Sequence, residues 1–193
     1  MTMSPEIHYD VFFETSTAAS SSDLELIPQK DNSLQLSISL AIEQLLSENR
    51  KQKYYTSKIR EQSKMIFSSS TIPKISILEY LNRIVNYTKI EDSTLITSII
   101  YLDSVTKNGI YLTDYNIHTL LLICILIAIK MNEDDIYTND YYAEVAGISL
   151  KKLNKIEHEF LNMNKFKLFV DKDIFEQYQR YLSNFYLNTK IYG

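Results

Sequence analysis

The side chains that could carry catalytic chemistry are few, and their spacing does not suit it. His158 and Glu159 are adjacent, but the sequence that they begin, HEFLN, lacks the second histidine of the zinc-protease pattern HExxH. The three glycines, Gly109, Gly147 and Gly193, lie too far apart to form a phosphate-binding loop. We therefore predict no catalytic residues and a protein that is not an enzyme.

Metal and thiol chemistry find no better support. Asp134-Asp135 and Asn139-Asp140 faintly resemble a calcium loop, but the glycine of its turn and the final glutamate ligand are missing. We interpret this stretch as a solvated acidic loop. Cys124 lies inside the most apolar run, without the positive surroundings that activate a thiolate. His118 is expected to be a core or capping histidine, so we predict neither a metal nor a cofactor.

Two charged residues, Lys130 and Glu157, are flanked by apolar residues at helical spacing. Lys130 continues the helical row of Ile123 and Ile127, so an apolar row ends in an ammonium group. Glu157 has a leucine four residues away on either side, which leaves its carboxylate poorly solvated unless a partner supplies hydrogen-bond donors. An ordinary surface pair, worth less than about 1 kcal/mol, fits the same spacing. The sequence alone leaves the binding site and the ordinary pair equally open.

The element that must position Lys130 is the apolar run Ile117–Ile129, IHTLLLICILIAI. It is too short to cross a bilayer, which takes about 20 residues. A helix that is apolar on all sides belongs at the centre of a helical domain. The chain is 45% hydrophobic and has only three glycines and three prolines, which favours an all-α fold. We expect Lys130 to surface at the edge of this domain, where a partner docks.

Periodicity and capping residues predict seven helices and their order. Five of them form a compact domain, with an additional helix on each side. Their expected ranges are 34–46, 75–87, 92–107, 114–131, 140–146, 150–163 and 174–186. The expected caps include Thr113 or Asp114 for the central helix, Thr138 or Asn139 for the short one, and Ser149 for the next.

The chain divides into three parts on composition. Residues 1–33 include the low-complexity stretch TSTAASSS and are expected to form a disordered extension. Residues 34–70 form an N-terminal helix and a basic linker, and residues 71–188 form the compact domain with its C-terminal helix. The stretch Arg50–Lys64 has six basic residues against one acid, which indicates a solvated connector or, alternatively, a nuclear-targeting or nucleic-acid patch.

Charge and cysteine content restrict the binding partners and the cellular compartment that we expect for this chain. The net charge of −4 disfavours a nucleic-acid-binding body, because phosphates require a basic face. A single cysteine allows no disulfide within the chain, which favours a reducing compartment. The first ten residues lack the apolar core of a signal peptide. We expect an intracellular protein of the cytoplasm or nucleus, without membrane insertion.

Several short motifs then occur in a recognisable order. They are YLD (Tyr101–Asp103), H.LLL (His118–Leu122), A.K..ED (Ala128–Asp134), N.YYA.V.GIS (Asn139–Ser149), L..IE..FL (Leu153–Leu161) and F.L (Phe166–Leu168). Together they resemble a cyclin box, and most of all a single box of the phosphate-regulatory and U-type (Pho80-like) cyclins. The resemblance runs from about Leu34 through Leu182, and the order of so many motifs is what makes it specific.

This resemblance implies a non-catalytic regulatory subunit that binds and activates a cyclin-dependent kinase of the Pho85 or Cdk5 kind. In that family, the lysine and glutamate at the positions of Lys130 and Glu157 bind the backbone at the kinase C-helix. The apolar residues that would pack on the same helix are Ile127, Met131, Leu161 and Leu168. A cyclin-fold adaptor that activates no kinase is the alternative, and a nucleic-acid binder that uses the basic stretch is a third.

The sequence also departs from the cyclin pattern. Ser104 replaces an arginine that commonly follows YLD, and Met131 replaces an aromatic residue. The resemblance suggests a link between Lys74 and Asp103, where many cyclins have a buried arginine–aspartate pair. The substrate-docking sequence of mitotic cyclins is absent around Ile75, so we do not expect substrate recruitment there.

Overall fold

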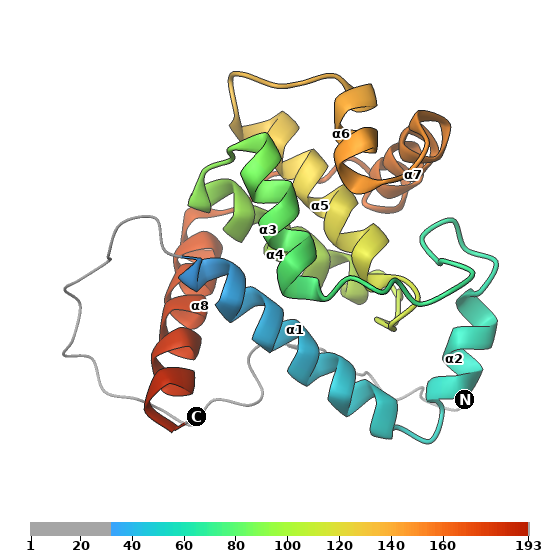
Figure 1. Cartoon of the computed structure of the whole chain (residues 1–193), viewed down its shortest axis with the longest axis horizontal. Helices are drawn as coiled ribbons and strands as arrows, with labels where there is room; N and C mark the ends of the chain where they lie inside the picture. Colours follow the sequence, from blue (N-terminus) through green and yellow to red (C-terminus); the bar gives the residue numbers. More distant parts are fainter. Residues whose placement is uncertain (1–31, 193) are drawn as a thin grey trace, which may run out of the picture.

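The chain folds into a bundle of helices, and no strand occurs in the part that the structure describes (Figure 1). The structure is a computed structural model that describes residues 32–192. Its helices are α1 (Ser33–Lys51), α2 (Tyr55–Gln62), α3 (Ile77–Thr88), α4 (Asp92–Lys107), α5 (Ile117–Asn132), α6 (Asn139–Ala146), α7 (Leu150–Met163) and α8 (Lys172–Tyr192). The all-α prediction is confirmed. The predicted extension lies almost entirely outside the described residues.

Helix α5 forms the centre of the bundle, as its composition predicts (Figure 1). From Ile117 to Ile129 every side chain is buried except that of His118, which is half-buried. The helix packs against α4 and α7. Helix α1 in turn packs against α8 and α3. Surrounding helices thus remove all faces of α5 from water, and only its C-terminal end, at Lys130, reaches the surface.

The turn between α6 and α7 is built by two residues that the sequence identifies. Gly147 adopts a left-handed conformation, with φ of 71°, which ends α6. Ser149 then caps α7, and its hydroxyl accepts a hydrogen bond from the backbone N–H of Lys152. The predicted start of α7 is confirmed, and α7 leaves the turn with Glu157 two turns further on.

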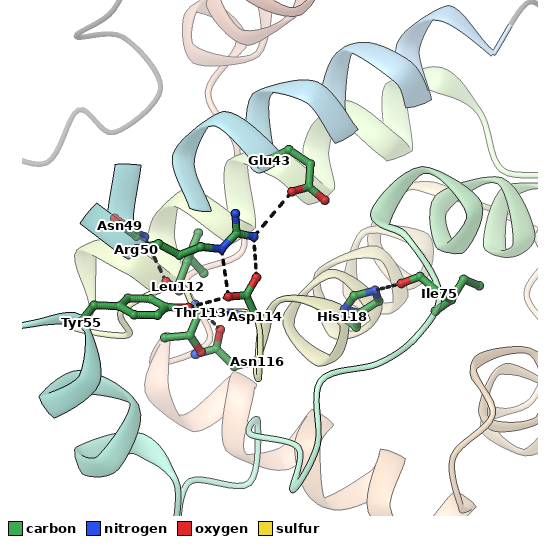
Figure 2. Close-up of polar contacts among 10 residues, drawn as sticks. All are labelled: Glu43, Asn49, Arg50, Tyr55, Ile75, Leu112, Thr113, Asp114, Asn116 and His118. Atoms are coloured by element: carbon green, nitrogen blue, oxygen red, sulfur yellow. Dashed lines mark hydrogen bonds and ion pairs between the residues drawn. The ribbon is translucent and has the colours of Figure 1, made fainter. Parts of the chain in front are cut away.

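The basic stretch, predicted to be a solvated connector, is mostly exposed and largely helical. It contains the end of α1 and the whole of α2. Two of its side chains bind Asp114: Arg50 forms hydrogen bonds of 3.0 and 2.6 Å to the carboxylate, and the Tyr55 hydroxyl donates another of 2.7 Å (Figure 2). Local composition could not reveal this helix, because the partner that anchors it lies about sixty residues away in sequence.

The start of α5 differs from the prediction for the same reason. The helix begins after Asn116, not at Thr113 or Asp114. The Asn116 side chain accepts a hydrogen bond from the backbone N–H of Thr113 (Figure 2). It also donates one to the carbonyl of Tyr111. Since Asp114 is bound by Arg50 and Tyr55, its carboxylate serves a tertiary contact and no helix cap.

The suggested link between Lys74 and Asp103 is replaced by other contacts. Asp103 is buried, and its carboxylate is bound by the Lys107 ammonium at 2.8 Å and the Tyr178 hydroxyl at 2.7 Å. Lys74 is exposed at the surface. Asp103 therefore ties α4 to α8, which explains why this buried carboxylate is tolerated.

None of the helices within residues 32–192 combines the length and apolarity needed to cross a membrane.

Candidate functional site

Lys130 and Glu157 meet at the surface, where the end of α5 lies beside the middle of α7. The Lys130 ammonium is 2.5 Å from one Glu157 carboxylate oxygen. The two side chains are 28% and 16% exposed, so the pair is largely but not fully withdrawn from water. The sequence proposed each residue separately, and the fold brings them together across 27 positions.

Asn139, at the start of α6, completes this site. Its side-chain amide donates to the second Glu157 oxygen at 2.7 Å and to the side-chain oxygen of Asn154 at 2.8 Å. The donors that Glu157 needs therefore come from within the chain. We call Lys130, Asn139 and Glu157 the charged site.

The predicted apolar contacts occupy different depths around the charged site. Met131 is 52% exposed and forms part of the surface. Leu161 and Leu168 are partly buried against the core. Ile127 is only 2% exposed, so in the isolated chain it supports this surface from beneath. The four predicted apolar contacts thus range from buried to half exposed in the isolated chain.

Two phenylalanines beyond the end of α7 are strongly exposed. Phe166 is 64% exposed and Phe169 is 88% exposed, the highest value among the large apolar side chains of the described chain. Lys165 and Phe166 both adopt left-handed backbone angles, with φ of 51° and 57°. Such angles are uncommon for side chains with a Cβ, so this turn holds a conformation that the chain does not favour by itself.

Sequence analysis missed Asn139 as a site residue, and also Phe166 and Phe169. For Asn139 the sequence suggests a helix cap or part of a calcium-like loop, and no local pattern shows that its amide meets Glu157. Phe169 lies in the mostly apolar run FKLFV, whose composition predicts burial. The one sequence signal for an exposed Phe169 is that this apolar run follows directly after the helix that contains Glu157.

Groups considered for catalysis lie elsewhere and are unsuited to it. Burial raises the pKa of the Cys124 thiol well above its usual value, so it is held as an inert thiol. Asp134, Asp135 and Asp140 are exposed, as expected for a solvated loop. No three side chains that could share a metal ion converge within residues 32–192.

The far end of α5 is fixed by contacts of its own. The His118 ring nitrogen Nε2 lies 2.9 Å from the carbonyl oxygen of Ile75, before α3 (Figure 2). This oxygen can only accept, so Nε2 carries the proton, and Nδ1 is buried without a hydrogen-bond partner. This contact, with those of Asp114 and Asn116, fixes the N-terminal end of α5.

Comparison with known proteins gives a consistent result. A family model described as Cyclin matches residues 15–168. Cyclin-U2-2 of Arabidopsis thaliana is 41% identical over 115 residues, which is 58% of this chain and 50% of that protein. PHO85 cyclin-like protein psl1 of Schizosaccharomyces pombe is 34% identical over 125 residues, 63% of this chain and 51% of that protein.

A third relative is PHO85 cyclin-7 of Saccharomyces cerevisiae, which is 31% identical over 135 residues, 63% of this chain and 47% of that protein. The chain thus spans about half the length of the curated relatives that it matches. The predicted resemblance to U-type and Pho85-related cyclins is confirmed by these relatives.

Proposed function

Since the chain belongs to the cyclin family, we propose that it is a non-catalytic regulatory subunit that binds and activates a cyclin-dependent kinase of the Pho85 or Cdk5 kind. Two relatives have names that refer to PHO85, which supports this class of kinase. The observation that carries the proposal is the charged site, a half-buried cluster of donors and an acceptor beside an apolar surface. The kinase is an intracellular enzyme, so we place the complex inside the cell.

The charged site suits the backbone of a helix end on a partner. Lys130 has an ammonium that can donate to free carbonyl groups, and Glu157 has a carboxylate that can accept from free N–H groups. In the isolated chain each satisfies the other, so neither is left as a bare charge. On association, backbone groups of the partner would form hydrogen bonds with Lys130 and Glu157 in addition to their mutual ion pair. Met131, Leu161 and Leu168 would bury apolar area beside the pair.

Binding of this kind explains activation without any catalytic group on the cyclin. A kinase is active when its C-helix lies inward, so that the helix glutamate pairs with the nucleotide-binding lysine. A partner that binds only the inward position shifts the population of the kinase toward it by the difference in binding free energy. Phe166 and Phe169, which follow α7 and are exposed, would add apolar area to the interface if the kinase also covers the end of α7.

Charge exchange tests the role of the site. Lys130→Glu and Glu157→Lys each place two like charges together, and we expect each to abolish kinase association. The double exchange restores an ion pair within the chain, so folding and stability should return. If Lys130 and Glu157 contact the kinase, association stays lost in the double variant. Recovery of kinase binding by the double variant would contradict their assignment as kinase contacts.

The exposed pair of Lys58 and Glu61, 3.0 Å apart on α2, offers a matched control. Exchanging its charges should change neither folding nor kinase association. Pull-down from cells of origin, followed by a kinase assay of the eluate, identifies the partner and measures activation in one experiment.

The adaptor alternative shares this surface but predicts an eluate without enhanced kinase activity. The nucleic-acid alternative is weakened by the contacts of the basic stretch: Arg50 is bound by Asp114, and Lys58 by Glu61. Binding to RNA or DNA that decreases steeply with salt would favour it.

A further inference from the structure

A second exposed surface lies where the end of α3 meets the loop between α5 and α6. Tyr87, Ile136 and Tyr137 are each between 48% and 58% exposed there. Tyr141 joins them: its ring centroid is 4.3 Å from that of Tyr137, at 31° between planes, and its hydroxyl donates to the Tyr87 carbonyl at 2.8 Å. We call Tyr87, Ile136, Tyr137 and Tyr141 the aromatic corner.

The chain around the aromatic corner is strongly acidic. The stretch Glu133–Glu144 contains five acidic residues and no lysine, arginine or histidine, a charge of −5, although the whole chain has only −4. Glu133 is engaged internally, because its carboxylate accepts from the Glu91 backbone and the Thr94 hydroxyl. The other four acids are exposed, and they are Asp134, Asp135, Asp140 and Glu144.

The aromatic corner is held in place without a partner. The Tyr142 hydroxyl is buried below it and accepts a hydrogen bond of 3.1 Å from the backbone N–H of Tyr137. Tyr142 also contacts the rings of Tyr137 and Tyr141 edge-on, at centroid distances of 6.2 and 6.1 Å. The exposed rings therefore keep their arrangement before any ligand arrives, which lowers the entropy lost on binding.

From this combination we propose that the aromatic corner binds an arginine-bearing peptide segment of a partner protein. A planar guanidinium stacks on an exposed tyrosine ring and, at the same time, donates two parallel hydrogen bonds to a carboxylate. Tyr137 supplies the ring, and Asp134, Asp135 and Asp140 supply the carboxylates within a few positions of it in sequence. Lysine satisfies the charge but lacks the planar face, and nucleic acids and anionic membranes are repelled by the same acids.

The proposed binding surface goes beyond kinase binding. Its loop leaves α5 just after Lys130 and returns to Asn139, so the aromatic corner adjoins the charged site but uses none of its residues. Binding of the peptide is a property of this chain alone, and it can be measured without any kinase.

The test uses the full chain and a fluorescent peptide in which arginines alternate with glycine and serine. Fluorescence anisotropy should show binding that weakens with salt. Tyr137→Ala should weaken it about threefold, the effect expected of one exposed cation–π contact, while Tyr137→Phe keeps the ring and the affinity. Replacing every arginine by lysine should weaken binding by a similar factor.

Two double variants separate local from general charge effects. Asp134→Asn with Asp135→Asn should weaken binding of the arginine peptide. Glu48→Gln with Glu159→Gln removes two exposed acids on other helices and should not. Equal losses in both double variants, or unchanged binding in Tyr137→Ala with circular dichroism like that of the wild type, would overturn the proposal.

Discussion

At the scale of single residues, the surroundings of a side chain decide its role more than its type does. Glu157 and Asp114 are both carboxylates near an interhelical surface. Asp114 is bound by Arg50 and Tyr55. The hydrogen bond from the Arg50 guanidinium lowers the pKa of Asp114 most, and the hydrogen bond from Tyr55 lowers it further, while burial acts in the opposite direction. Glu157 has one oxygen on Lys130 and the other on Asn139, at a surface open to a partner. The first carboxylate stabilises the fold, and the second is the one that we propose as a kinase contact.

His118 should make stability depend on pH near neutrality. Burial lowers its pKa from the usual 6.5, so the folded state favours the neutral ring. The unfolded chain therefore binds the proton first as the pH falls through about 6.5, and stability decreases until the folded-state pKa is reached. Urea unfolding at pH 7.5 and 5.5 should show this loss, and His118→Gln should reduce it. The same loss in His118→Gln as in the wild type would contradict the assignment, and exposed His158→Gln serves as control.

The Asp114 contacts should act in a different pH range. Asp114→Asn loses the ion pair with Arg50 and should cost about 1 kcal/mol at pH 7, a modest value because Arg50 is largely exposed. Since the pKa of Asp114 is lowered from 3.8, the wild-type advantage persists to acidic pH and disappears only as the pH falls through the folded-state pKa. Chemical denaturation at pH 7 and 3 measures both effects, with Asp135→Asn as the exposed control.

At the scale of elements, the α6–α7 turn positions the charged site. Asn139 opens α6, and Glu157 lies in α7, so the angle between the two helices sets the distance of 2.7 Å between their side chains. The sequence predicted the boundaries of both helices, but only Ser149 of α7 makes a side-chain capping hydrogen bond, whereas Thr138 before α6 makes none. The angle between the helices is set by packing of Val145, Leu153 and Ile156 into the core, and no local pattern encodes it.

Gly147 provides a test of that turn. Its φ of 71° lies in the left-handed region, although no atom lies within 4 Å of the position that a Cβ would take. Gly147→Ala should therefore cost about 1 kcal/mol through backbone strain alone. Gly147→Asn should cost less, because asparagine tolerates this conformation. Thermal unfolding compares the two, and equal costs would show that strain at this φ is not the cause.

At the scale of the whole molecule, three surfaces have separate roles. Arg50, Tyr55 and Asp114 hold α1, α2 and the start of α5 together. The charged site and its apolar neighbours lie at the other end of α5. Acidic charge concentrates beside the aromatic corner, so the net charge of the chain conceals a strongly polarised surface.

Kinase binding should stabilise the whole fold by mass action. With free kinase at about 100 times the dissociation constant, the gain in unfolding free energy is about 2.7 kcal/mol. Differential scanning fluorimetry should thus show a higher Tm in the mixture than for the chain alone. The double exchange of Lys130 and Glu157 should fold normally but show no such rise. A rise equal to that of the wild type would place the kinase interface elsewhere.

By itself, the sequence determined the helical class, the central position of α5 and the boundaries near Gly147 and Ser149, and it singled out Lys130 and Glu157 as candidates for binding. These features follow from periodicity, capping and solvation, which act over a few neighbouring residues. Only the tertiary structure decided that Lys130 meets Glu157 and Asn139, that α2 is a helix, and that Phe169 is exposed. Each of these depends on contacts between residues far apart in the chain, whose energies no local pattern contains.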